Sequence, residues 1–158
     1  MSALLLGGCG GDDSEPEADA SAASTTAPTG ERLVLRTRIV IADEERAETI
    51  ATGVVLDGSA IGDSEFCVGG TIVDVHGSPD PDVALIARTI RCPDGRLELR
   101  LRPDVGEEPQ GQTQTGSWTI GGGTGAFEGL RGDGKLEVVY GPTAGSPVRE
   151  TLTGTVAR

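Results

Sequence analysis

Residues 31–41 alternate between two kinds of side chain, and this period of two constrains the fold more than any other feature of the sequence. One phase is apolar apart from a single hydroxyl, and the other carries arginines: Leu33, Leu35, Thr37, Ile39 and Ile41 against Arg32, Arg36 and Arg38. Because successive side chains of a strand point to opposite faces, the pattern predicts a β-strand with one buried and one solvated face.

Seven more strand-like runs follow the first, and turn signals separate them. The runs are 49–56, 64–75, 83–92, 96–102, 117–121, 134–140 and 148–157. The glycines and prolines between them, as in Pro93-Asp94-Gly95, are typical of tight turns. No helical stripe of ten residues or more is evident, although residues 43–48 fit a short turn. Eight short strands with regular turns predict an all-β fold, either an antiparallel sandwich or a barrel.

Composition limits the number of domains and the classes of partner. A chain of 158 residues with 36% apolar content can fill one core, and we place that single domain at residues 31–158. Aromatic content is only 3%, so Val, Ile, Leu and Ala must make most of the core. The net charge of -12 and the scattered Lys and Arg argue against nucleic acid as a partner, because phosphates would be repelled.

The first nine residues resemble a bacterial lipobox. Leu4-Leu5-Leu6-Gly7-Gly8-Cys9 is an apolar run that ends in small residues and a cysteine. The resemblance implies that residues 1–9 are a truncated signal peptide and that lipidated Cys9 anchors an exported protein to the outer face of the bacterial cell membrane. Only Met-Ser-Ala precedes the leucines, whereas a signal peptide has a basic region and at least about seven apolar residues. A cysteine without a role therefore stays an alternative.

Two further stretches bear on membrane attachment and export. Residues 10–30 are rich in Gly, Ser, Ala, Thr and Pro with five acids and no base, which predicts a disordered tether. No run approaches the roughly 20 apolar residues of a membrane span, so we expect attachment by lipid only. Cys67 and Cys92, each in a strand-like run, are expected to pair if the protein is exported. In a reducing compartment they would be buried thiols.

A glycine-rich stretch carries a resemblance to a known family. The GGTG-x-F-x-x-x-RG stretch of the allene oxide cyclase and dirigent β-barrel group is similar to Gly122, Gly123, Thr124, Gly125, Phe127, Arg131 and Gly132. A weaker likeness lies at residues 62–66 and 70–74. The resemblance covers residues 31–158 and implies an eight-stranded up-and-down antiparallel barrel that encloses an apolar cavity. It does not identify catalytic residues in this chain.

The same glycines invite a second interpretation as a phosphate loop. Residues 129–135 satisfy G-x-x-x-x-G-K, but Leu136 stands where such a loop needs Ser or Thr, and no helix is expected to follow. We therefore expect a corner: the strand at Trp118 leaves the sheet through residues 121–125, Phe127 docks on the barrel end, and residues 132–134 supply positive φ.

Candidate catalytic and metal-binding residues are few, and no cofactor or metal is expected. His76 at a strand end is more typical of a solvated loop than of a base. Asp74, Asp80 and Asp82 could gather around calcium, but they lack the spacing of a known calcium loop, so a solvated acidic turn is favoured. Strand carboxylates such as Glu65, Asp74 and Glu98 could also meet inside a barrel.

Two functions from different classes remain. We favour a non-enzymatic envelope module that binds a small apolar ligand or has a structural role. The alternative is a cyclase-like or dirigent-like enzyme, an isomerase if it follows the cyclase, acting on an apolar substrate. A cavity of roughly 300 Å3 or more with a buried carboxylate near its floor would favour the enzyme, whereas a fully packed barrel would exclude both activities. Because relatives form trimers, a homo-oligomer stays open.

Overall fold

The computed structural model describes residues 29–42, 48–80, 82–104 and 112–158. The predicted lipidation site Cys9, the tether up to residue 28 and most of the turn predicted at 43–48 lie outside these ranges. The described residues form ten β-strands and no helix, which confirms the all-β prediction. Accordingly, this part of the chain contains no helix of the length and apolarity needed to cross a membrane.

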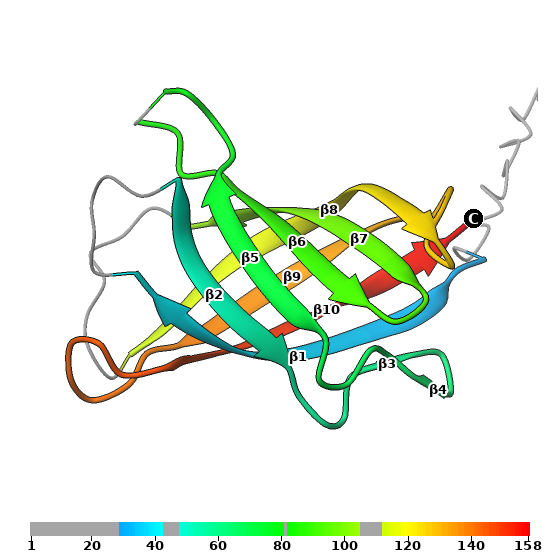
Figure 1. The fold of residues 1–158 in the computed structure, drawn as a ribbon, viewed down its shortest axis with the longest axis horizontal. Coiled ribbons are helices and arrows are strands. Elements are labelled where there is room, and N and C mark those ends of the chain that lie inside the picture. The colour runs from blue at the N-terminus through cyan, green and yellow to red at the C-terminus, as the bar shows by residue number, and fades with distance from the viewer. Residues whose placement is uncertain (1–28, 43–47, 81, 105–111) are drawn as a thin grey trace, which may run out of the picture.

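Eight of the strands close into a barrel (Figure 1). They are β1 (Glu31–Ile41), β2 (Thr49–Val55), β5 (Thr71–His76), β6 (Ile86–Cys92), β7 (Gly95–Pro103), β8 (Thr113–Gly125), β9 (Arg131–Val139) and β10 (Val148–Ala157). Each strand pairs antiparallel with the next in this order, and β10 pairs with β1 to close the sheet. The predicted eight-stranded up-and-down barrel is confirmed.

A small hairpin of the two remaining strands lies beside one end of the barrel. β3 (Ala60–Ile61) pairs with β4 (Ser64–Glu65) and with the first half of β1. Phe66 follows β4 and is buried in the core. The run predicted at 64–75 is therefore wrong as one strand: the chain leaves the hairpin, buries Phe66 and re-enters the barrel only at Thr71.

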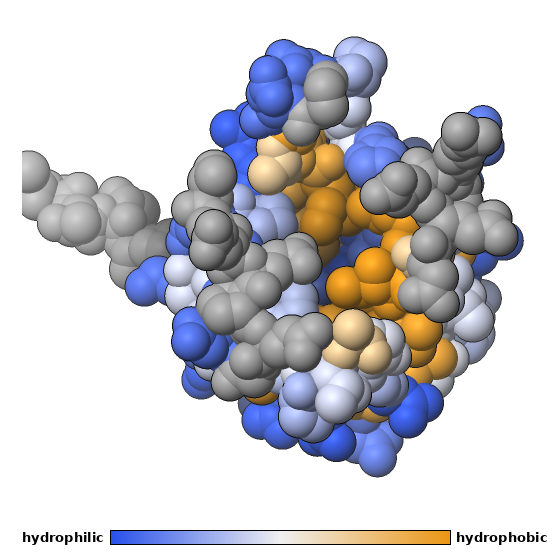
Figure 2. Space-filling view, turned by 90° about the vertical axis from the view of Figure 1, so that its left-hand side faces the viewer, coloured by the Kyte–Doolittle hydropathy of each residue, from blue (hydrophilic) through white to orange (hydrophobic). Residues whose placement is uncertain are grey.

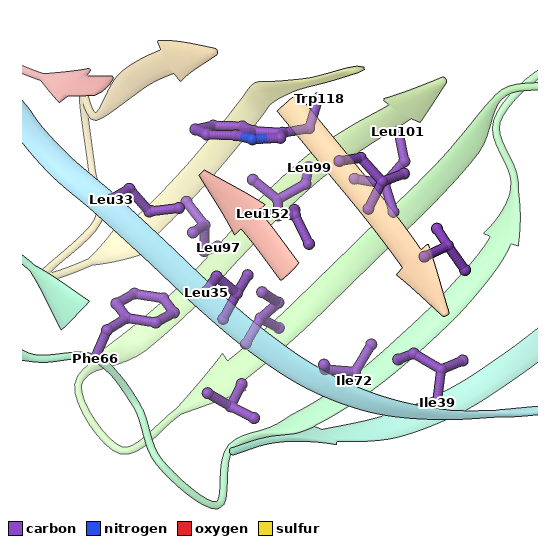
Figure 3. Close-up of a cluster of buried hydrophobic side chains, with 14 of the residues drawn as sticks. Leu33, Leu35, Ile39, Phe66, Ile72, Leu97, Leu99, Leu101, Trp118 and Leu152 are labelled. Carbon is purple, nitrogen blue, oxygen red and sulfur yellow. The ribbon is translucent and has the colours of Figure 1, made fainter. Parts of the chain in front are cut away.

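The half of the barrel beside the hairpin, here called the closed half, is filled with large apolar side chains. Figure 3 shows them converging from several strands. None of the following is more than 4% exposed: Leu33, Leu35, Phe66, Leu97, Leu99, Trp118 and Leu152. Apart from Phe66, which lies between β4 and β5, they belong to the inward phase of their strands, as the period of two predicts for β1.

Glycines allow β9 and β10 to pack closely, and the one at position 154 also makes room for Trp118. A Cβ on Gly154 would lie 2.6 Å from Cζ2 of the indole, and one on Gly134 would lie 2.0 Å from the carbonyl oxygen of Thr153. Gly132 and Gly134 sit within β9 and do not have positive φ. The expectation that residues 132–134 supply positive φ is wrong, because these glycines allow close packing instead.

The glycine-rich stretch does turn a corner, but later than predicted. β8 does not leave the sheet at Gly121; it runs on to Gly125, which pairs with Gly95, and a bulge absorbs one extra residue. The turn then uses positive φ at Gly125 (62°) and Gly129 (74°). Phe127 docks on the barrel end as predicted, with its ring centroid 5.5 Å from that of Phe66.

A disulfide ties the hairpin loop to the closed half. Cys67 and Cys92 form the predicted pair, with their Sγ atoms at disulfide distance and their Cα atoms 5.4 Å apart. Cys92 ends β6, but Cys67 lies outside the strands, with φ of 51°, which corrects its placement in a strand. The bridge holds the segment that carries Phe66 against the barrel.

Candidate functional site

A cavity opens at the end of the barrel opposite the hairpin, and Figure 2 looks into it. Its volume is about 350 Å3, which lies within the range of small-molecule sites. Figure 2 shows hydrophobic residues around the mouth and hydrophilic surface deeper in the hollow. The cavity is lined from all eight barrel strands, with walls that include Ile39, Ala51, Ile86, Leu136, Val138 and Val148. We call this part of the barrel the open half.

A cluster of four polar side chains, the polar floor, separates the cavity from the closed half. Arg88 donates two hydrogen bonds to Asp74, from Nε to Oδ1 at 2.8 Å and from Nη2 to Oδ2 at 2.6 Å. Its Nη1 donates to Oε2 of Glu150 at 2.5 Å. Thr37 donates its hydroxyl hydrogen to the same Oε2 at 2.9 Å. Asp74 and Glu150 line the cavity.

Strand register and barrel closure bring these four residues together. Asp74 and Arg88 are direct partners on β5 and β6, and Thr37 and Glu150 are direct partners on β1 and β10. In the closed order of eight strands, β6 and β10 are four strands apart, so they form opposite walls. Arg88 therefore reaches across the interior and joins two walls that are far apart along the sheet.

The polar floor is almost completely buried, and its electrostatics follow from that. Asp74 is 2% exposed, Arg88 1% and Glu150 8%. Burial raises the pKa of Asp74 above its ordinary value, although the hydrogen bonds and charge of Arg88 act in the opposite direction. Burial alone would lower the pKa of Arg88, but Glu150 and Asp74 outweigh it and raise that pKa. Arg88 therefore stays protonated.

The carboxylates predicted from sequence do not meet one another. Asp74 does point into the barrel, but Glu65 is exposed on β4, and Glu98 lies at the surface, 3.1 Å from Arg96. Asp74 instead meets Arg88 and Glu150. The prediction of inward carboxylates is therefore right for Asp74 and wrong for its partners.

Two of the three calcium candidates, Asp80 and Asp82, and the histidine candidate His76 lie outside the cavity. Asp80 and Asp82 are exposed in the loop after β5, where the backbone N–H of Asp82 donates to Oδ1 of Asp80. Asp74 points away from them into the barrel, so the three do not gather. His76 is exposed at the end of β5. Among the residues that the structure describes, no group of three or more His, Cys, Asp or Glu is placed to hold a metal ion.

Sequence reasoning missed Thr37, Arg88 and Glu150 as site residues, although the sequence does contain a signal. Each one occupies the inward phase of a strand that is otherwise apolar, as Arg88 does between Ile86 and Ile90. Such a residue must find a partner inside the barrel, because an isolated buried charge is costly. Which partner it finds depends on closure of the barrel.

The family-like residues lie at the other end of the molecule. Gly122 to Gly132 span the end of β8, the turn and the start of β9, and Arg131 is exposed there. A second hollow, of about 490 Å3, lies near this end around Phe66, Phe127 and the disulfide. Its lining contains no buried polar side chain, so it has no group comparable to the polar floor.

Comparison of the chain with family models, with curated proteins and with solved structures finds no match. The resemblance to the allene oxide cyclase and dirigent group therefore stays a prediction.

Proposed function

We propose that the protein is an exported, lipid-anchored envelope module that binds a small, mostly apolar molecule in the open half of its barrel. The observation that carries the proposal is the cavity of about 350 Å3, which has mostly apolar walls and the buried polar floor at its inner end. Burial of apolar ligand surface would supply the affinity, at roughly 25 cal/mol per Å2. The polar floor would orient the ligand by its polar group.

The family and the location belong to the same proposal. The Gly122–Gly132 stretch and the eight-stranded up-and-down barrel support a relation to the allene oxide cyclase and dirigent group. The motif at Cys9 and the Cys67–Cys92 pair support export. β1 starts at the closed half, so a tether would join the barrel at the end opposite the cavity mouth.

Fractionation tests the lipid anchor. The full chain is expected in the membrane fraction of a bacterial host, and Cys9→Ala is expected to move it to the soluble fraction. Unchanged fractionation of the variant would reject lipidation at Cys9, while leaving the binding proposal intact.

The polar floor favours a second candidate, an enzyme of the cyclase-like class. The cavity exceeds the volume of roughly 300 Å3 set above, and two buried carboxylates lie at its floor. A carboxylate so placed could act as a general base or stabilise developing positive charge on a bound substrate. Binding is common to both candidates, so binding is tested first.

Native mass spectrometry of the full chain, purified from a bacterial envelope extract, tests binding and counts subunits in the same spectrum. We expect a retained small molecule that is lost in Ala51→Phe, because Ala51 lines the cavity and the larger ring would fill it. Thr52→Phe is the matched control, since Thr52 is exposed on the opposite face of β2. Equal loading of all three proteins, each with a normal thermal unfolding transition, would contradict binding in the cavity.

The retained molecule then separates the two candidates. Incubated with the wild-type protein, a substrate is converted to a second compound, whereas a ligand is recovered unchanged. For an enzyme, Glu150→Gln is expected to abolish the conversion while the molecule still binds.

A further inference from the structure

One carboxylate oxygen at the floor of the cavity lacks a hydrogen-bond donor. Glu150 is 8% exposed, and its Oε2 accepts hydrogen bonds from both Arg88 and Thr37. No described residue donates to Oε1. No side-chain oxygen in the described ranges is both fully enclosed and unpartnered. Oε1 has no partner within these ranges and is therefore not fully enclosed. Because Glu150 lines the cavity, Oε1 is the carboxylate oxygen that it presents to a ligand.

The neighbouring groups of the polar floor are already engaged. Both carboxylate oxygens of Asp74 accept hydrogen bonds from Arg88. Arg88 is 1% exposed, does not line the cavity, and directs Nε, Nη1 and Nη2 at the two carboxylates. The guanidinium is therefore shielded from an incoming molecule, and Glu150 is the residue of the polar floor that still has a carboxylate oxygen without a donor among the described residues.

The charge of the cavity has a definite sign. Two carboxylates and one guanidinium make up the charged groups of the floor, which leaves one negative charge without a counter-charge. Among the described lining residues, Asp104 adds another acid near the mouth, and no Lys or Arg contributes. Apolar walls strengthen the attraction of a cation and the repulsion of an anion, because the effective dielectric constant is lower than in water.

We propose that the ligand is a small apolar amine, bound with its protonated nitrogen on Oε1 of Glu150 and its hydrocarbon body against Ile39, Val138 and Val148. The inference rests on the proposed binding function and specifies the chemistry of the ligand. An ammonium group offers the hydrogen-bond donors that Oε1 lacks and cancels the unbalanced charge. A fatty acid or another organic anion fits poorly, since the cation that could receive it is screened by both carboxylates.

Three matched probes test the inference with the full-length protein. 4-Phenylbutylamine, 4-phenylbutanol and 4-phenylbutanoic acid share one apolar body and differ only in the polar end. Titration calorimetry is expected to rank the amine about tenfold or more above the alcohol, because both can donate a hydrogen bond to Oε1 but only the amine brings a charge opposite to that of the carboxylate. The acid is expected to bind weakest.

Glu150→Gln assigns the preference to one residue. The variant keeps the size of the side chain and removes its charge, so the amine is expected to lose about tenfold in affinity, while the alcohol changes less than about threefold. Unfolding curves of the variant check that it folds. If the variant does not fold, the ranking of the three probes on the wild-type protein still decides whether the cavity prefers an amine.

The outcomes distinguish this inference from the proposed function. Binding of the alcohol as tightly as the amine, or tightest binding of the acid, would overturn the amine proposal and leave cavity binding intact. Binding of none of the three, together with an empty native mass spectrum, would overturn both.

Discussion

The closed and open halves of the barrel are built from the same strands, yet one is filled and the other is hollow. On β1, Leu33 and Leu35 pack in the closed half, whereas Ile39 and Ile41 line the cavity. Trp118 and Phe66 add aromatic volume to the filled part, whereas the described walls of the cavity are mostly aliphatic, with Tyr140 as their aromatic member. The cavity is therefore a product of side-chain size and not of the barrel fold itself.

The polar floor at the boundary of the two halves is hard to explain by stability alone. Burying an arginine with two carboxylates carries a desolvation cost, and well-packed apolar residues of similar volume often fold as well or better. The cluster lies where the packed core ends and the cavity begins. The proposed role toward a bound molecule would account for that position.

Removing the guanidinium of Arg88 is expected to have the largest effect on stability, because the polar floor between the two halves then loses its cation. Arg88→Met leaves two buried carboxylates without their cation and is expected to lower the free energy of unfolding by about 3–5 kcal/mol. Urea denaturation at neutral pH measures it. Arg91→Met on the same strand is the control, since Arg91 is exposed and its loss should change stability by less than about 0.5 kcal/mol.

The loss of unfolding free energy in Arg88→Met is also expected to depend on pH. Arg88 lowers the pKa of Asp74, so without it that pKa rises further above the ordinary value. A carboxyl group with a raised folded-state pKa contributes stability below its unfolded pKa, about 3.9, and loses it as the pH rises through the folded-state value. The variant should therefore be closest to wild type near pH 4. An equal deficit at pH 4 and at neutral pH would show that the two carboxylates are not buried as described.

Reduction of the disulfide is expected to weaken the closed half and spare the open one. Cys67 and Cys92 are 25 residues apart, so in the chain-entropy model their bridge contributes about 3 kcal/mol. Urea denaturation with and without reductant measures this loss, and an intact mass lower by two hydrogens confirms the bridge. Affinity for a cavity ligand should not change. A mass with both thiols free would refute the bridge.

The smallest expected effect is the difference in stability loss between two truncations on one strand. Leu33→Ala creates a new void in the packed half and should cost about 4 kcal/mol, whereas Ile39→Ala widens a cavity that exists already and should cost about 2 kcal/mol. Chemical denaturation of the two variants gives the difference directly. Equal losses would mean that the open half is packed as tightly as the closed half.

Local features of the sequence predicted much of the fold. β1 and β10 have the predicted ends, because an uninterrupted period of two runs through both. Prediction failed where a long-range contact overrode the local pattern. The run at 64–75 is broken by the burial of Phe66, and β8 extends well beyond the predicted 117–121, because its glycines pair with β7 instead of leaving the sheet.

By itself, the sequence determined the all-β class, the positions of most barrel strands and which side chains of β1 face inward, since turn residues and alternation act over a few neighbours. Only the tertiary structure decided which inward residues meet. Arg88 and Glu150 are 62 residues apart, and Thr37 and Glu150 are 113 apart. Their contacts exist because β10 closes on β1 in one register and places β6 on the opposite wall, and such pairing over long separations leaves no local trace in the sequence.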